Sequence, residues 1–269
     1  MRFEHYSGAG NRFLLIETTE ISSDWASVAI AACAREGSDG LLILHYAVDR
    51  AWHMIIFNAD GTRPEACGNG LRCIAWHLTR TGGGSVTTIQ TDAGPRRVEV
   101  LQRSGNTASV VTEMGVLHTQ KVNGDLPRIS GLLEVLNVNI GNPHCVLRVE
   151  DERDAPVEFV GRSLQDHTDY PHGVNVGFLS LRDSSWHLRV WERGVGETSA
   201  CGTGACAASA LISEKGTETM IKMRGGPLRV RLGLNSCAEL FGEAVYLGDC
   251  ELDLAESMPD SRDSARKAR

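Results

Sequence analysis

Lysine is scarce in this sequence. Its 269 residues include only four lysines, Lys121, Lys215, Lys222 and Lys267. None of them lies in a repeated motif. Enzymes that use pyridoxal phosphate bind it through a lysine Schiff base, so this scarcity weighs against that cofactor.

The chain also lacks an excess of positive charge, a long apolar run and a leader pattern. The formal net charge is −7, which gives no basic footprint for nucleic acid or an anionic membrane. The apolar runs fall far short of the roughly 20 residues that cross a bilayer. Residues 1–20 show no basic region followed by an apolar core. We therefore expect no nucleic-acid partner, no membrane span and a cytoplasmic location.

Eight cysteines are present, and we expect free thiols, because a chain of this length without export signals is expected to stay reduced. Most are interpreted as small buried residues, as at Cys33, Cys73 and Cys206. Cys67 and Cys201 differ from these because each precedes a Gly-x-Gly turn.

The two turns belong to an internal repeat. Residues 66–70 and 200–204 both read Ala-Cys-Gly-polar-Gly, and a Trp-His pair lies fifteen positions before each cysteine (67 − 52 and 201 − 186). The offset between the copies is constant at 134 positions (201 − 67 and 186 − 52). This period is too long for a solenoid unit and indicates a duplicated domain.

Each copy predicts the same order of strands, a helix, more strands, an enclosed helix and further strands. The enclosed helices are expected over 69–81 and 203–214, the smaller helices over 25–35 and near 161–166, and the last strands near 238–246 and 249–254. Local antiparallel strands with few helices favour an α+β fold. The copies are expected at 1–118 and 119–247, and the polar tail 255–269 is expected to be disordered.

The chemistry at each turn follows from its position. A Gly-x-Gly turn at a helix N-terminus exposes backbone N–H groups, and the helix dipole adds about half a positive charge there. The same field is expected to lower the pKa of a cysteine from its free value of about 8.5. Each turn would thus offer a thiolate beside a cradle for a carboxylate or phosphate.

Two such cysteines related by a pseudo-twofold axis could face each other across one ligand. One would remove a proton from a carbon while the other donates to the opposite face, which inverts a stereocentre without a metal or another cofactor. The residues alone leave two alternatives open, a non-catalytic anion-binding module and a hydrolase with a cysteine nucleophile. A disulfide between Cys67 and Cys201 would be an oxidation product of facing thiols.

Other motif classes fit less well. The turn at 68–70 lacks the third glycine of a dinucleotide fingerprint, and neither turn carries the Gly-Lys-Ser/Thr of a P-loop. The spacings between Cys67 and Cys73 and between Cys201 and Cys206 are loose for a zinc site.

The motifs together resemble the diaminopimelate epimerases, cofactor-independent enzymes of lysine and peptidoglycan biosynthesis. The matching stretches run in order along the chain: Tyr6-Ser7-Gly8-Ala9-Gly10-Asn11, Phe57-Asn58-Ala59-Asp60-Gly61, Ala66-Cys67-Gly68-Asn69-Gly70, Gly141-Asn142-Pro143-His144-Cys145, Val174-Asn175-Val176-Gly177-Phe178, Glu192-Arg193-Gly194-Val195-Gly196-Glu197-Thr198 and Ala200-Cys201-Gly202-Thr203-Gly204-Ala205-Cys206. Proline racemases also use two cysteines, but the Asn-Pro-His and Glu-Arg-Gly segments resemble the epimerases.

The resemblance implies two pseudo-symmetric domains, each a mostly antiparallel sheet wrapped around a central helix, with the strand near 248–254 returning to the first domain. It implies a homodimer, diaminopimelate as substrate, and interconversion of its LL and meso forms with Cys67 and Cys201 as the base–acid pair. His144 and Glu192 would help to set cysteine protonation. The substrate would be bound by Asn11, Asn58, Gly68, Asn69, Asn142, Asn175, Glu192, Arg193, Gly202 and Thr203.

Two positions depart from the family pattern. Arg12 stands where Gly-Asn is usually followed by Asp, and Gly40 stands where a substrate-facing glutamine is usual. Loss of that side chain is expected to leave a roomier pocket. The alternative prediction is therefore a racemase of relaxed specificity that also acts on glutamate.

Overall fold

The computed structural model describes residues 1–19, 24–47, 50–65, 67–122 and 128–254. Its sixteen strands form one continuous sheet, and twelve of its sixteen strand pairings are antiparallel, with β2–β3, β4–β5, β10–β11 and β12–β14 parallel. The expected α+β fold with a mostly antiparallel sheet is confirmed. The predicted tail at 255–269 lies outside the described residues.

The first unit holds β1 to β7 with two helices. Its elements are β1 (Arg2–Gly8), β2 (Asn11–Thr18), α1 (Trp25–Glu36), β3 (Gly40–Tyr46), β4 (Trp52–Asn58), α2 (Gly68–Arg80), β5 (Val86–Gln90), β6 (Arg96–Ser104) and β7 (Thr107–Val116).

The second unit repeats this order. Its elements are β8 (His118–Gln120), β9 (Leu132–Asn139), β10 (Pro143–Val149), α3 (Val157–Gln165), β11 (Asn175–Arg182), β12 (Ser185–Glu192), β13 (Gly196–Thr198), α4 (Gly202–Ile212), β14 (Glu218–Met223) and β15 (Gly226–Leu232), followed by the long strand β16 (Cys237–Glu251).

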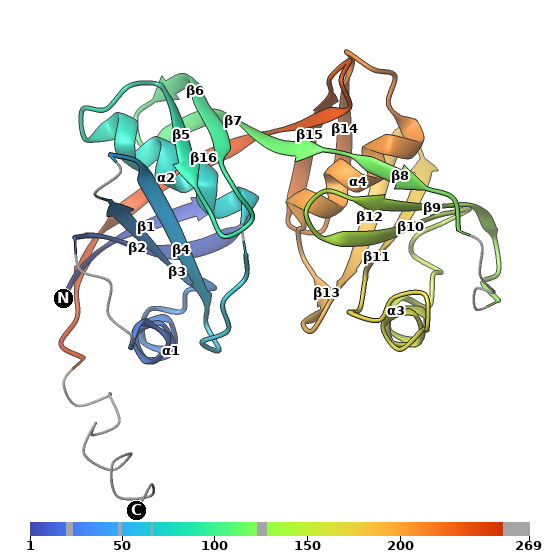
Figure 1. Cartoon of the computed structure of the whole chain (residues 1–269), viewed down its shortest axis with the longest axis horizontal. Helices are drawn as coiled ribbons and strands as arrows, with labels where there is room; N and C mark the ends of the chain where they lie inside the picture. Colours follow the sequence, from blue (N-terminus) through green and yellow to red (C-terminus); the bar gives the residue numbers. More distant parts are fainter. Residues whose placement is uncertain (20–23, 48–49, 66, 123–127, 255–269) are drawn as a thin grey trace, which may run out of the picture.

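Each unit is a barrel around one helix. Strands β1 to β7 and β16 close a ring, because β16 pairs with both β7 and β1. Helix α2 fills this ring and is buried from Gly68 to Thr79. In the second unit, helix α4 packs against β9 to β12, β15 and β16, and β7 and β16 run between the two bodies (Figure 1). Because β16 pairs with β7 of the first unit and with β15 of the second, the strands of both units form one sheet.

A second helix covers the outer face of each barrel. Helix α1 packs on an apolar layer that includes Phe3, Leu41 and Ile43, and α3 packs on the corresponding layer of β10 and β11. The two helices lie on the same side of the molecule (Figure 1). No helix among the described residues is long and apolar enough to cross a membrane.

Two sequence predictions need correction. Helix α3 begins at Val157, not near 161. The last two predicted strands are one strand, β16, with a bulge where the partners of His5 and Tyr6 change from Gly248 to Tyr246. Gly248 has φ of +134°, a conformation open to glycine, so a bulge replaces the predicted break.

Candidate active site

The two repeated cysteines cap the two enclosed helices. Cys67 is the N-cap of α2 and accepts a hydrogen bond from the Gly70 N–H at 3.4 Å, and Cys201 is the N-cap of α4 and accepts from the Gly204 N–H at 3.3 Å. Their backbone angles nearly coincide, with φ −141° and ψ 114° at Cys67 and φ −135° and ψ 109° at Cys201. The duplication therefore repeats the thiol geometry as well as the motif.

Both helix N-termini pack on one side chain. Leu240 of β16 contacts Gly68 and Gly202, because a Cβ at Gly68 would lie 3.2 Å from Leu240 Cδ2 and a Cβ at Gly202 would lie 2.7 Å from the same atom. Any side chain at Gly202 would displace Leu240. Glycine at these two positions thus lets the first turns of α2 and α4 converge.

Burial controls the protonation of the two thiols. Burial raises the pKa of Cys67. The backbone N–H groups of Gly70 and Asn69 and the positive charge of Arg72 act in the opposite direction but are weaker. Burial raises the pKa of Cys201 still more clearly, and the Glu192 carboxylate acts in the same direction. The expectation of lowered cysteine pKa values is wrong for the free protein, because desolvation of the thiolate outweighs the helix N-terminus.

Glu192 connects the two cysteines. It lies at the end of β12, is in hydrogen-bond contact with Cys201, and also acts electrostatically on Cys67. Thr198 donates to Glu192 Oε1 at 2.6 Å. Burial raises the pKa of Glu192, and the contacts with Thr198 and Cys201 oppose that rise.

A buried polar chain begins at the first turn of α2. Asn69 donates from Nδ2 to Asn11 Oδ1 at 2.7 Å, and Arg72 donates to Asn69 Oδ1 at 2.6 Å. Arg72 is fully buried, and burial lowers its pKa. Its Nε has no hydrogen-bond partner among the described residues. The Arg72 side chain therefore places a buried positive charge near Cys67.

A second chain approaches Cys201. The buried His144 lies with Nε2 3.2 Å from Asn142 Oδ1, Asn142 donates to Thr203 Oγ1 at 3.4 Å, and that hydroxyl lies 3.4 Å from Cys201 Sγ. Burial, aided by the positive charge of Arg193, lowers the pKa of His144 to about 3. His144 is therefore neutral near pH 7.

The remaining predicted site residues fall into two groups. Asn175 Nδ2 donates to the Pro143 carbonyl at 3.0 Å, and Asn175 Oδ1 accepts from the Arg193 backbone N–H at 2.9 Å, so this amide joins β10, β11 and the end of β12. Asn58 stands apart, because its side chain donates to Thr62 Oγ1 at 2.9 Å in the turn after β4.

Comparison with known proteins assigns this arrangement to a family. The family model described as diaminopimelate epimerase matches residues 3–119 and 136–247. The chain is 34% identical to the diaminopimelate epimerase of Moorella thermoacetica over 94% of this chain and 100% of that protein. It is 33% identical to the diaminopimelate epimerase of Leptospira biflexa over 94% of this chain and 99% of that protein. The chain belongs to the diaminopimelate epimerase family. It is accordingly an epimerase, a class of isomerase.

Solved structures share the fold at lower identity. A phenazine biosynthesis protein of the PhzF family from Bacillus anthracis aligns with a TM-score of 0.72 at 13% identity, covering 94% of this chain and 99% of that one. A hydroxyproline epimerase from Agrobacterium vitis aligns with a TM-score of 0.70 at 15% identity, covering 93% and 91%. The two-barrel architecture is therefore common to several proteins.

The two departures from the epimerase pattern lie side by side. Gly40 pairs with Phe13 and Asn58, and a Cβ there would lie 2.8 Å from the Phe57 carbonyl oxygen. A side chain at position 40 would therefore require β3 and β4 to shift, and the roomier pocket stays a prediction. The exposed Arg12 donates its backbone N–H to Asp39 Oδ2 at 2.7 Å.

Two residues that contact predicted site residues are not singled out by the sequence, Arg72 beside Asn69 and Thr198 beside Glu192. A charged residue inside an otherwise apolar helix marks Arg72 as unusual, because a buried arginine needs a specific role. Thr198 carried no comparable signal, since its contact with Glu192 depends on the return of β13 along β12.

One cluster of metal-ligand types occurs among the described residues outside this site. His5, Glu36 and Cys250 bring ligand atoms within 4.8 Å of one another. His5 alternates along β1 with Tyr6, which faces the core around α2, so the cluster lies on the α1 side of the barrel. It is separate from the two cysteine caps.

Proposed function

We propose that this protein interconverts LL- and meso-diaminopimelate by transferring protons at one α-carbon between Cys67 and Cys201. The observation that carries the proposal is the pair of equivalent N-capping thiols on two helices whose first turns both contact Leu240. The names of the relatives supply the substrate class. The exposed N–H groups at two helix N-termini suit a carboxylate.

In the forward step, a thiolate at one cysteine removes the α-proton, and the C–H electron pair passes into the carboxylate as an enolate. The thiol of the other cysteine then donates its proton to the opposite face of that carbon. Each turnover therefore moves one proton off and one proton on, and leaves the two cysteines with exchanged protonation. Backbone N–H groups of Gly68, Asn69, Gly202 and Thr203 would stabilise the enolate charge.

The two thiols are electrostatically unequal. Arg72 favours the thiolate of Cys67, whereas the Glu192 carboxylate, in hydrogen-bond contact with Cys201, favours the neutral thiol there. We infer that Cys67 is the base and Cys201 the acid at the start of one direction. For the opposite direction, Cys201 would pass its proton to the Glu192 carboxylate, and the Cys67 thiolate would take a proton from solvent.

The other residues would act on the substrate or on the thiols. Asn11, Asn58, Asn142, Asn175 and Arg193 would position the substrate, several of them at its non-reacting end. His144 reaches Cys201 only through Asn142 and Thr203, so a neutral His144 would act by orienting that chain.

The decisive experiment is α-proton exchange in deuterated water, with LL- and meso-diaminopimelate as substrates and glutamate in parallel. We expect solvent deuterium in the product epimer for both diaminopimelate isomers. Cys67→Ala and Cys201→Ala should each abolish epimerisation, whereas Cys33→Ala, a buried cysteine of α1, should retain it. Substantial inversion by either single variant would exclude the two-base mechanism. Turnover of glutamate would support the relaxed-specificity alternative.

The proposal extends to organisation in the cell. We propose domains at 1–118 and 119–247, a homodimer as the active assembly, and a cytoplasmic location. Light scattering at micromolar protein concentration tests the dimer, and a monomer mass with full activity would exclude it.

A further inference from the structure

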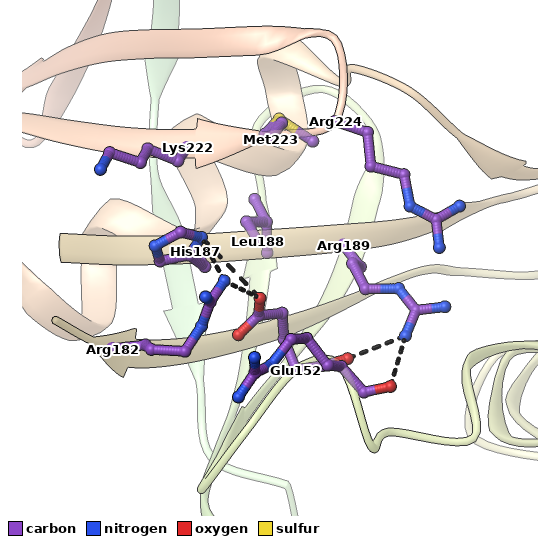
Figure 2. A pocket seen from close by; sticks show the side chains of 9 residues that line it. Glu152, Arg182, His187, Leu188, Arg189, Lys222, Met223 and Arg224 are labelled. Carbon is purple, nitrogen blue, oxygen red and sulfur yellow. Dashed lines mark hydrogen bonds and ion pairs between the residues drawn. The ribbon is translucent and has the colours of Figure 1, made fainter.

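A pocket with charged walls lies in the second unit, on the outer face of the barrel. Its volume is about 380 Å³, within the range of small-molecule sites. In Figure 2 the lining side chains come from β11, β12, β14 and the segment after β10, and Lys222 and Arg224 extend toward opposite ends of the pocket. They are Glu152, Arg153, Arg182, His187, Leu188, Arg189, Lys222, Met223 and Arg224.

The pocket exists because two parallel strands separate. Strands β12 and β14 pair only at Trp186–Ile221 and His187–Lys222, although β12 continues to Glu192. Side chains alternate across a strand, so Leu188 and Met223 point into the core around α4. The neighbouring positions on both strands point outward and form the walls.

Five of the nine lining residues are arginine or lysine, and their charges are incompletely matched. Arg153 pairs with Asp151, Arg182 with Glu152, and Arg189 with Glu197. Arg224 shares the same Glu197 at 3.2 Å. Arg182 also lies 4.0 Å from the exposed Asp183, so Lys222 is the one lining cation without a carboxylate partner among the described residues.

Unused donors support this count. Within the described parts of the chain, the exposed Lys222 has no hydrogen bond or ion pair, and the buried Nε of Arg182 has no acceptor. Arg224 has 57% of its side chain exposed. A buried donor normally finds an acceptor in the protein or in a ligand or water.

The internal duplication provides a comparison at the same place in the fold. By the offset of 134, Arg189 corresponds to Ile55 of β4, and by the strand register Lys222 corresponds to Gln90 of β5. Ile55 packs in the apolar layer under α1. Helix α3 has nine residues where α1 has twelve, and its apolar layer includes Trp191 but not Arg189. At these two positions the second copy therefore carries a positive charge and the first copy an uncharged side chain.

From these observations we propose that the pocket binds the phosphoryl group of a small phosphorylated metabolite, at a site distinct from the two cysteines. A phosphate monoester carries nearly two negative charges and three acceptor oxygens. Guanidinium forks and a lysine ammonium suit such a group. The concave shape, with an apolar floor at Leu188 and Met223, favours a small molecule over an extended polyanion.

The site also adjoins the cysteine site through β13. Glu197, which holds Arg189 and Arg224, is followed by Thr198, which donates to Glu192. A ligand that draws Arg224 away from Glu197 would act on a strand next to the proposed acid–base group. Binding itself is independent of the proposed reaction, because no lining residue belongs to the cysteine site.

Isothermal titration at low ionic strength tests the proposal, with inorganic phosphate, AMP and adenosine as probes. We expect saturable binding of AMP at one site per chain and no binding of adenosine. If the ligand is a phosphate ester, inorganic phosphate should bind with lower affinity than AMP. If the ligand is free phosphate, the two affinities should be equal. Succinate should bind at least about ten-fold more weakly than phosphate, since it lacks the tetrahedral acceptor set.

The variants are matched in chemistry. Lys222→Gln installs the residue of the first copy and should weaken AMP binding about ten-fold, the equivalent of about 1.4 kcal/mol. Lys222→Gln combined with Arg224→Gln should abolish it. Lys215→Gln, which removes an exposed lysine outside the pocket, should leave binding unchanged. Circular dichroism melting confirms that each variant is folded.

Several results would overturn the proposal. They are absence of saturable AMP binding to the wild-type chain, wild-type affinity in the folded double variant, an equal loss in Lys215→Gln, and equal affinity for AMP and adenosine. Equal binding of succinate and phosphate would reject the phosphoryl assignment.

Discussion

Thr198 holds Glu192 by a hydrogen bond of 2.6 Å from Oγ1 to Oε1, and Glu192 in turn contacts Cys201. Two adjacent strands, β12 and β13, thus fix the carboxyl beside the second thiol. Burial raises the pKa of Glu192, and the hydroxyl of Thr198, together with the contact to Cys201, favours the carboxylate form.

Thr198→Val should move the acid limb of the pH profile for kcat/KM to higher pH by about one pH unit or more. The variant keeps the side-chain shape and removes a hydrogen bond to a charged group, a loss of about 1.5–3 kcal/mol for the carboxylate form. The pKa of Glu192 therefore rises further. Thr198→Ser retains the hydroxyl and should follow the wild-type profile. Superimposed profiles for Thr198→Val and wild type would contradict this role.

Arg72→Met should raise the pH at which Cys67 becomes reactive. The positive charge of Arg72 lowers the pKa of Cys67 against the effect of burial, and methionine fills a similar volume without charge. Iodoacetamide labelling of Cys67, followed by mass spectrometry from pH 6 to pH 10, measures the midpoint. Arg72→Lys keeps a cation and should lie between the two. Identical midpoints in wild type and Arg72→Met would show that the charge does not act on this thiol.

The sequence predicts an element of the fold well where the local order of apolar residues and glycines is enough to define that element. Helix α2 was expected over 69–81 and spans Gly68–Arg80, because its apolar residues and the glycines after it leave little alternative. The sequence predicts two strands near 238–246 and 249–254, whereas the structure has the single strand β16. Its continuity comes from pairing with β1 and β7, and such long-range partners leave no local signal.

The sequence predicts which residues form the candidate site better than it predicts the pKa shifts of their side chains. The repeat identified Cys67 and Cys201 because both copies kept one motif at one offset. The direction of their pKa shifts was wrong, since the sequence shows a helix N-terminus but not how completely two barrels desolvate it. Arg72 and Thr198 act through contacts that appear only when α2 is enclosed and β13 returns along β12.

Buried His144 should destabilise the fold in acid. Its pKa is about 3 in the folded protein because of burial, against about 6.5 in an unfolded chain. Between these values only the unfolded state binds the proton, so the free energy of unfolding falls as pH decreases from about 6.5 toward 3, by about 1.4 kcal/mol per pH unit.

Urea unfolding at pH 7 and pH 5 measures this contribution as a difference between wild type and His144→Gln. On lowering the pH, the wild type should lose about 2 kcal/mol more than the variant, from 1.5 pH units of that slope. His118→Gln removes an exposed histidine and should behave as wild type. Equal pH dependence in wild type and His144→Gln would mean that His144 can be protonated in the folded protein.

Gly40→Ala should lower the free energy of unfolding by about 1–3 kcal/mol, because the new methyl group would lie 2.8 Å from the Phe57 carbonyl oxygen and force β3 and β4 apart. Thermal or urea unfolding measures the loss. Gly84→Ala is the matched control, since its nearest contact would be an ordinary 3.6 Å to the Val86 carbonyl oxygen. Both changes reduce unfolded-chain entropy equally, so their difference isolates the contact. Equal stability of the two variants would show that β3 and β4 can accept a side chain at position 40.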